Sequence, residues 1–246
     1  MKRTQIFVFL FFLVSCSPNG VQTYQDYPDS KIWAHKANDT LIAQQKELLF
    51  DGLEVDVQYS AFQDEFFIGH ELEDTNNGVT LARWFSSLKH VSEKWFWIDM
   101  KNLDESNALQ IANKIIQLKQ TFGISHLMLE SRDWKALKIV KETNIPVIFL
   151  VSDNFWYWKE FDTVGWYNLV RKKVNYLHPD ALSCEYRMFP LLPDSFPEYP
   201  IHFWHTQVVD SVPIDYTPEN VEFTRKLCNH KSVKVVLVDY GEPISY

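Results

Sequence analysis

The chain has 246 residues, of which 24 are lysine or arginine and 32 are aspartate or glutamate, so its formal net charge is −8. Its 9 Trp, 11 Tyr and 18 Phe exclude intrinsic disorder, because a disordered chain lacks such groups to bury. The acidic balance, without a long Lys/Arg run, argues against nucleic-acid binding, and 3 Cys are too few for a disulfide scaffold. A globular domain with a sizeable core is expected.

The first residues have the pattern of an export signal. A basic start precedes an apolar run over 6–14, which is shorter than the roughly 20 residues that cross a bilayer. Leu13-Val14-Ser15-Cys16 then resembles the bacterial lipobox, in which the cysteine is lipidated. This predicts a signal peptide over 1–15, a lipid on Cys16 and a tether over 16–30, in a protein anchored in the bacterial cell envelope that faces the periplasm or the surface. An ordinary secretory signal is the alternative.

Short runs of β-branched and aromatic residues alternate with longer segments of helical period in the rest of the chain. The predicted strands are Ile32–Asn38, Leu53–Tyr59, Phe66–His70, Trp95–Lys101, His126–Ser131, Pro146–Ser152, Ala181–Glu185, Ile201–Thr206 and Val233–Tyr240. The predicted helices are Asp39–Phe50, Leu81–Val91 after its cap Thr80, Ser106–Phe122 before Gly123, Trp134–Glu142, Phe155–Leu177 and Glu219–Cys228.

This alternation predicts one (β/α)8 TIM barrel over 31–246. If Phe66–His70 forms a hairpin with the strand before it, eight β→α units remain, and a barrel of this kind typically has about 250 residues. An open doubly wound sheet is the alternative. Such a sheet usually has a Gly-rich phosphate turn after its first strand, where this chain has His35-Lys36-Ala37-Asn38.

In a barrel, chemistry takes place at the carboxyl ends of the strands. The polar residues near these ends are His35, Asn38, Glu54, Asp56, His70, Asp99, Lys101, Glu130, Glu185, His205 and Asp239. Glu54 and Asp56 are two residues apart on one strand, so both are expected to point into the barrel mouth. With Asp99 they form an oxygen-rich cluster that suits one divalent cation, Ca²⁺ or Mg²⁺. An ion-pair network with Lys101 and Lys36 is the alternative.

Four motifs resemble, in order and spacing, those of glycerophosphodiester phosphodiesterases and the wider phospholipase-C-like superfamily. They are Trp33-Ala34-His35, Gly52-Leu53-Glu54-Val55-Asp56-Val57, Gly69-His70 and Ile98-Asp99-Met100-Lys101. The menorin-like branch is the most similar, because it also has His-x-x-Asn, Asp before Lys, and a segment like Thr80-Leu81-Ala82-Arg83-Trp84. The specific motifs cover 32–102, and Val238-Asp239-Tyr240 resembles the end of that barrel.

The resemblance implies a metal-dependent phosphodiester hydrolase acting on a glycerophosphodiester- or phospholipid-like substrate. His35 and His70 would exchange protons with the attacking and leaving oxygens, since imidazole titrates near neutral pH, and Lys101 would sit near the phosphate. Substrate contacts are expected from Lys36, Asn38, Glu130 and Glu185. Lys36 stands where glycerophosphodiesterases have arginine, which binds phosphate through two donors as lysine does not.

Several features have an ordinary structural explanation. His178 and His205 are more simply structural than catalytic, and Phe155-Trp156-Tyr157-Trp158 fits core packing better than a substrate or membrane surface. Cys184 and Cys228 are expected to be free, buried thiols. A non-catalytic barrel lipoprotein that binds a phosphorylated or glycan ligand is the alternative to an enzyme.

Overall fold

The structure is a computed structural model, and it describes residues 27–71, 78–151, 162–205, 208–209, 212–213 and 218–239. The predicted signal peptide, Cys16 with most of the tether, and the aromatic segment 155–158 lie outside the described residues.

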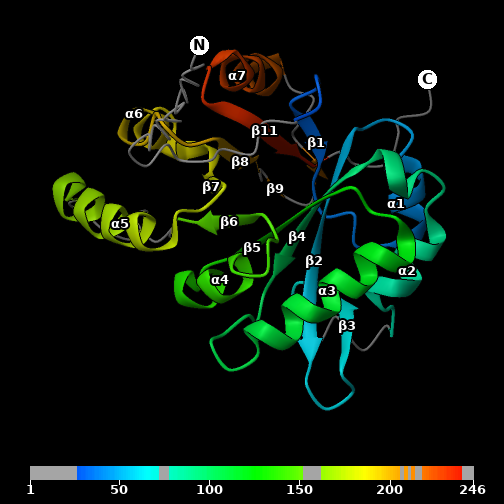
Figure 1. Cartoon of the computed structure of the whole chain (residues 1–246). Coiled ribbons are helices and arrows are strands. Elements are labelled where there is room, and N and C mark those ends of the chain that lie inside the picture. Colours follow the sequence, from blue (N-terminus) through cyan, green and yellow to red (C-terminus); the bar gives the residue numbers. More distant parts are fainter. Residues whose placement is uncertain are drawn as a thin grey trace, which may run out of the picture.

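Eight parallel strands close into a barrel (Figure 1). They are β1 (Ile32–Ala34), β2 (Gly52–Ser60), β4 (Trp95–Met100), β5 (His126–Ser131), β6 (Val147–Leu150), β7 (Ala181–Glu185), β8 (Ile201–His205) and β11 (Val233–Val238). This is also their order around the barrel, and pairing of β11 with β1 and of β1 with β2 completes the ring. The antiparallel strand β3 (Glu65–Ile68) extends β2 as the predicted hairpin. The (β/α)8 barrel is thus confirmed.

Helices follow the strands and lie on the outside of the barrel (Figure 1). They are α1 (Thr40–Lys46), α2 (Leu81–Ser87), α3 (Ala108–Phe122), α4 (Trp134–Lys141), α5 (Thr163–Leu177), α6 (Leu191–Ser195) and α7 (Pro218–Asn229). The predicted cap Asp39 accepts hydrogen bonds from two backbone N–H groups of α1, and Thr80 accepts one from α2. Gly123 ends α3 with a left-handed φ of 63°, as its position in the sequence predicts.

Residues two apart on a strand point to the same face. The side chains of each strand therefore alternate between a layer inside the barrel and a layer between the barrel and its helices. On β4, Trp95 and Trp97 point into the barrel, whereas Phe96 and Ile98 pack against the helices. The cluster inside the barrel consists of Trp33, Trp95, Trp97, Met128, Ile148, Ala181, Val235 and Leu237. Tryptophans therefore fill much of the space below the barrel mouth.

The structure differs from the sequence-based prediction mainly at element ends and in loops. β1 stops at Ala34 rather than Asn38, because the chain turns at Lys36, which has a left-handed φ of 49°. The predicted helix from Leu81 is shorter and is followed by a 3-10 turn, η2 (Val91–Glu93). Not predicted were η4 (Tyr186–Met188), α6 and the small hairpin β9 (Val208–Val209) and β10 (Val212–Pro213).

The N-terminal end of the barrel is covered by Tyr27, the first described residue, which belongs to the predicted tether. Its ring stacks on Trp95 with a centroid distance of 5.5 Å, and its hydroxyl lies 2.9 Å from Nε2 of the buried His202. In Figure 1, the beginning of β1 and α7 lie at one end of the picture and the β2–β3 hairpin at the other. The end of the tether is thus packed onto the barrel.

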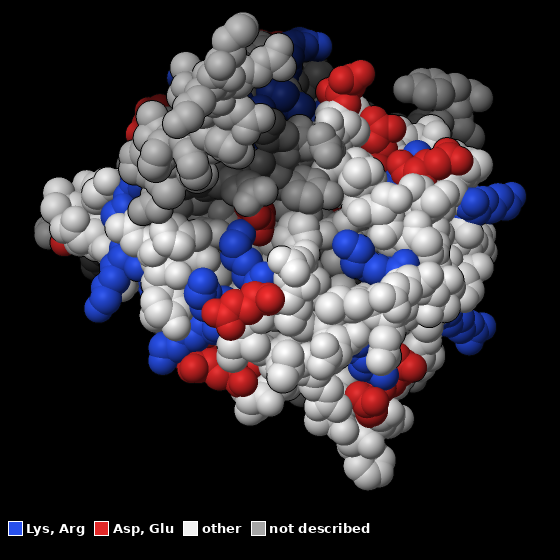
Figure 2. All heavy atoms as spheres, viewed as in Figure 1, with Lys and Arg blue, Asp and Glu red and all other residues white. Residues whose placement is uncertain are grey.

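Other sequence-based expectations concern the cysteines and the surface. Cys184 and Cys228 are both free; Cys184 is buried and Cys228 half-buried. Within the described part of the chain, no helix has both the length and the apolar character to cross a bilayer. Acidic and basic side chains are interspersed on the face shown in Figure 2.

Gly52 provides a test of how Trp33 packs inside the barrel. A Cβ added there would lie 2.1 Å from Trp33 Cδ2, so we expect Gly52→Ala to lower the free energy of unfolding by about 1–3 kcal/mol or more, as overpacked cores do. The control is Gly123→Ala, where a Cβ meets no atom within 4 Å and the left-handed φ costs only about 1 kcal/mol. Urea unfolding measures both. A smaller loss for Gly52→Ala than for the control would contradict the packing described here.

Candidate active site

Three carboxylates meet at the C-terminal end of the barrel. Glu54 and Asp56 come from β2 and Asp99 from β4, where Asp56 and Asp99 are direct neighbours in the strand register. One oxygen from each carboxylate lies within 4.8 Å of the others, and Glu54 and Asp56 are almost fully buried. The two-residue spacing on β2 therefore places both side chains in the mouth, as predicted.

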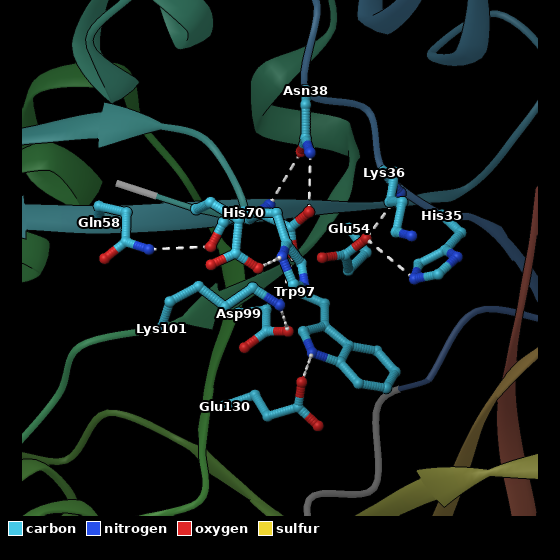
Figure 3. Close-up of polar contacts among 12 residues, drawn as sticks. His35, Lys36, Asn38, Glu54, Gln58, His70, Trp97, Asp99, Lys101 and Glu130 are labelled. Carbon is cyan, nitrogen blue, oxygen red and sulfur yellow. Dashed lines mark hydrogen bonds and ion pairs between the residues drawn. The ribbon is translucent and has the colours of Figure 1, made fainter. Parts of the chain in front are cut away.

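Lys101 lies between two of the carboxylates (Figure 3). Its Nζ is 2.7 Å from Asp56 Oδ1 and 2.5 Å from Asp99 Oδ2. Burial alone would raise the pKa of Asp56, but the Lys101 ammonium and its hydrogen bond lower it. Burial opposes the charged form of Lys101 as well, yet the two carboxylates raise its pKa. Lys101 thus compensates part of the negative charge.

Glu54 has no such cation beside it. Its Oε2 accepts a hydrogen bond of 2.6 Å from the backbone N–H of Lys36, but its buried Oε1 has no hydrogen-bond partner in the structure. Burial, together with Asp56 and Asp99, raises the pKa of Glu54 well above its usual value. Burial likewise raises the pKa of Asp99. The cluster has an unsatisfied acceptor and more negative charge than one lysine neutralises, which is what a cation site requires.

The turn after β1 holds the carboxylates in place. Asn38 donates from Nδ2 to Asp56 Oδ2 over 2.7 Å, and its Oδ1 accepts from the Asp56 N–H over 3.0 Å. The left-handed backbone of Lys36 directs its N–H toward Glu54. Asn38, expected to contact substrate, does not line the pocket but orients Asp56, whereas Lys36 lies exposed at the pocket rim.

His35 is buried beside the carboxylates and is oriented by Asp239. Its Nδ1 is 2.7 Å from Asp239 Oδ1, and its Nε2 is 3.8 Å from Glu54 Oε2. Burial opposes ionisation of Asp239, but the hydrogen bond from His35 lowers its pKa. An ionised carboxylate only accepts, so Nδ1 carries a proton and Nε2 is the atom left to exchange one with a ligand.

His70 lies on the other side of Glu54 from His35 (Figure 3). It follows β3, and its Nδ1 is 2.7 Å from Glu71 Oε1. Gln58, which points inward from β2, donates to the His70 backbone carbonyl over 2.9 Å. The His70 side chain is half exposed, unlike that of His35. The two histidines therefore flank the carboxylates, one buried and one open to solvent.

Glu130 forms part of the pocket floor. It accepts a hydrogen bond of 3.0 Å from Trp97 Nε1 and another from the Ser183 hydroxyl. Burial, reinforced by the charge of Asp99, raises the pKa of Glu130 to about 8. Glu130 is therefore a largely neutral acid at pH 7, and it lines the pocket as its expected substrate role requires.

The remaining candidates lie apart from this group. Glu185 is buried and its carboxylate pairs with Arg187, and it does not line the pocket. His178 is an exposed residue that ends α5 with a left-handed φ of 50°. The side chain of His205 lies outside the described part.

The site residues surround a pocket of about 460 Å³. Its polar lining residues include His35, Lys36, Glu54, Asp56, Gln58, His70, Glu71, Asp99, Lys101, Glu130, Ser131, Arg132 and Asp133. Sequence analysis did not identify the contributions of Gln58, Ser183 and Trp97 or the pairing of Asp239 with His35. The alternation of inward and outward side chains along each strand could have indicated that Gln58, Ser183 and Trp97 point into the barrel. Asp239 required the register of β11 against β1, where Ala34 pairs with Val238.

Comparisons with known proteins identify the fold. No family model and no curated protein sequence matches the chain. A glycerophosphodiester phosphodiesterase from Parabacteroides distasonis is similar in structure, with a TM-score of 0.59 and 15% identity, covering 85% of this chain and 92% of that one. An active domain of a chitinase from Pyrococcus furiosus has a TM-score of 0.55 and 13% identity, covering 86% and 84%. A phosphoenolpyruvate phosphomutase from Streptomyces platensis has a TM-score of 0.51 and 13% identity, covering 86% and 77%.

At these identities the comparisons establish the barrel fold. The similarity to a glycerophosphodiester phosphodiesterase fits the superfamily resemblance of the motifs. The chitinase and the phosphomutase are named for other reactions and have similar barrels, so the fold does not define the reaction. The reaction has to be argued from the site.

The pKa of Glu130 predicts a pH dependence of stability. The folded protein keeps this proton between pH 4.5 and about 8, where the unfolded chain has released it. Stability contributed by Glu130 is therefore complete below pH 4.5 and is lost as the pH rises toward 8. We expect Glu130→Gln to flatten the fall in unfolding free energy between pH 5 and 8, measured by urea titration with chelator present. Glu142→Gln, on the exposed end of α4, is the control, and an equal slope in both variants would contradict the assignment.

Proposed function

We propose that this protein is a metal-dependent phosphodiester hydrolase acting on a glycerophosphodiester- or phospholipid-like substrate. The observation that carries the proposal is a carboxylate cluster of the buried Glu54 and Asp56 and the half-buried Asp99, flanked by two histidines that are each bound to a carboxylate through Nδ1. A site that only binds a ligand has little use for two such histidines. The ordered motifs over 32–102, which resemble those of glycerophosphodiester phosphodiesterases, support the same reaction class.

One divalent cation, Ca²⁺ or Mg²⁺, would be held by Glu54, Asp56 and Asp99. Carboxylate oxygens are the ligands that both ions prefer, and the unpartnered Glu54 Oε1 offers a free one. When bound, such a cation would draw charge from a non-bridging phosphate oxygen. Asn38 orients Asp56 for this role through its two hydrogen bonds.

His35 and His70 exchange the protons that diester hydrolysis requires. One Nε2 accepts a proton from the attacking hydroxyl or water, and the other donates one to the leaving oxygen. Asp239 fixes the ring orientation of His35 through its hydrogen bond to Nδ1, and Glu71 does the same for His70. The position of the two rings on either side of Glu54 suits these opposed tasks.

Positive groups at the pocket bind the phosphate. Lys101, which contacts Asp56 and Asp99, would offer its ammonium to a phosphate oxygen, and Lys36 extends from the rim as a second point charge. Glu130, as a neutral acid in the floor, has a proton to donate to a substrate oxygen. Glu185 keeps its proposed substrate role only if its pair with Arg187 opens.

Metal binding is tested by calorimetry with Ca²⁺ and Mg²⁺. We expect a single site that Asp56→Asn weakens by at least about tenfold, because even residues that only support metal ligands change affinity by that factor. Glu71→Gln is the matched control, since it removes a carboxylate at the rim and leaves the three ligands intact. Equal affinity in Asp56→Asn and the native protein would remove Asp56 from the metal site.

The histidine roles are tested by turnover of a generic diester over a range of pH. We expect a bell-shaped profile, and a loss of roughly 10² to 10⁴ in turnover for His35→Ala and for His70→Ala, with metal affinity retained. The double variant should lose less than the product of the two, because residues that act as a unit are not additive. His178→Asn is the control and should leave turnover unchanged. Loss of the metal in His35→Ala would instead make His35 a ligand, and full activity in it would refute the mechanism.

The lipobox leads us to propose that the mature protein begins at a lipidated Cys16 in the bacterial cell envelope. A short apolar run cannot anchor the chain as a helix, so the lipid would be the anchor. We expect Cys16→Ala to move the protein from the membrane fraction to the soluble fraction of the cell. A Cys16→Ala protein that is processed normally and stays with the membrane would show that the anchor lies elsewhere.

A further inference from the structure

The side of α1 that points away from the barrel is apolar. Four aliphatic side chains of α1 and of the turn after it are exposed, namely Leu41 by 67%, Ile42 by 41%, Leu48 by 68% and Leu49 by 72%. The turn continues the helical path, because the Phe50 N–H bonds to the Lys46 carbonyl over 3.0 Å. With the exposed Gln45 between them, the four side chains lie on one side of a single helical segment. We call these five residues the outer α1 face.

The charged residues of this segment point the other way. Lys46 and Glu47 are both buried. Lys46 Nζ donates to the His35 carbonyl over 2.5 Å. The Glu47 carboxylate accepts hydrogen bonds from the backbone N–H groups of Lys89 and His90. A surface helix of a monomer normally turns its charged residues outward and its aliphatic residues inward, whereas a helix that is apolar on all sides is a buried helix.

The outer α1 face is also the largest group of its kind in the described part of the chain. The other exposed large apolar side chains there are spread over the β2–β3 hairpin, α3 and α5, and they are Phe62, Leu109, Val164, Leu169 and Tyr176. Single exposed apolar residues are normal, but a contiguous group marks an interaction site. α1 lies beside α2 at the edge of the barrel, where a second molecule can reach it (Figure 1).

The outer α1 face has the same pattern in both directions from Gln45. Aliphatic residues precede Gln45 by four and three positions and follow it by three and four. If two copies pack these segments antiparallel about a two-fold axis at Gln45, Leu41 meets Leu49 of the second copy and Ile42 meets Leu48. A two-fold interface is self-complementary, so that each contact occurs twice. The pattern therefore fits a second copy of this chain.

The apolar area is of the size that a dimer needs. Full burial of a leucine-sized side chain contributes up to about 3 kcal/mol at about 25 cal/mol per Å², which corresponds to about 120 Å². At their exposed fractions, the four side chains then offer up to about 300 Å² in each copy, or about 600 Å² in two. A standard interface of about 1,600 Å² contains about 900 Å² of apolar surface. The outer α1 face thus supplies up to about two thirds of that amount.

We infer that this protein forms a two-fold symmetric dimer in which the outer α1 faces of two copies pack antiparallel against each other. The two Gln45 carboxamides then meet near the axis, where each has both a donor and an acceptor to offer. A lipid bilayer does not require a symmetric pattern, and helices that lie on bilayers carry lysine or arginine on their polar side. The lysine of α1, Lys46, is turned into the protein instead.

The contact lies next to the active site without entering it. α1 follows the turn that carries His35 and Asn38, and Lys46 holds the His35 carbonyl. No residue of the outer α1 face lines the pocket, so each copy keeps its own site. The second copy therefore covers the helix that supports the His35 turn.

The dimer is tested by sedimentation equilibrium of the purified full chain in a density-matched detergent. We expect a monomer–dimer equilibrium whose dissociation constant rises by roughly 100-fold or more in Leu48→Glu, because symmetry places the new charge in the apolar contact twice. Leu169→Glu is the matched control, since Leu169 is 54% exposed on α5, and it should dimerise like the native protein.

Two results would overturn the inference. One is a native protein that remains monomeric at high concentration, and the other is a dimer that Leu48→Glu leaves intact. If the native monomer binds vesicles of phosphatidylethanolamine and phosphatidylglycerol and Leu48→Glu does not, the outer α1 face contacts a bilayer instead of a second copy.

The antiparallel register is tested by a short bismaleimide cross-linker in a Cys228→Ser background. Position 41 is expected beside position 49 of the second copy, whereas the two positions 41 are about 12 Å apart along the helices. A mixture of Leu41→Cys and Leu49→Cys proteins should therefore cross-link at least about fivefold faster than either alone, and Gln45→Cys should cross-link by itself. Leu169→Cys is the control and should not cross-link. Fastest reaction in Leu41→Cys alone would indicate a parallel pair, and this result, or no cross-linking at any of the three positions, would overturn the inference.

Discussion

Negative charge buried at one end of the barrel is the constraint on which the rest of the site depends. Two carboxylates at the separation seen among Glu54, Asp56 and Asp99 repel each other by about 3 to 4 kcal/mol at an effective dielectric constant near 20. Lys101 offsets this for Asp56 and Asp99, whose oxygens it contacts directly. Glu54 has no cation in contact with it, and burial together with the charges of Asp56 and Asp99 raises its pKa. Either a proton or a metal ion must complete the cluster.

The barrel keeps this charge at one end of its interior and apolar side chains in the rest. Indole rings fill the interior below the carboxylates, and Gly52 leaves the space in which Trp33 packs. Trp97 belongs to both regions, because its ring is part of the apolar layer while its N–H binds Glu130. The apolar layer excludes water from below, so the carboxylates exchange ligands only through the mouth. The same separation places the junction with the tether at the far end, behind Tyr27.

Much of this arrangement follows from the sequence, because it is encoded by local patterns. The alternation of strands and helices predicts the barrel, and the spacing of Glu54 and Asp56 predicts that they share a face. The pairing of His35 with Asp239 could not be predicted, because it joins residues 204 positions apart through the register of the closing strand. Asn38 was expected to contact substrate, and its support of Asp56 depends on a turn whose left-handed residue is a lysine rather than a glycine. Local sequence patterns thus predict where the site lies. Which of its side chains pair with each other depends on how strands that are distant in sequence align.

The most direct test of the central claim is the position of a bound cation. Crystals soaked in Ca²⁺ and measured by anomalous diffraction should show one peak within about 2.3 to 2.6 Å of oxygens from Glu54, Asp56 and Asp99. Lys101 should then no longer contact both Asp56 and Asp99. A site without such a peak at saturating Ca²⁺, with Lys101 still bridging the two aspartates, would contradict the claim and leave an ion-pair network in place of a metal centre.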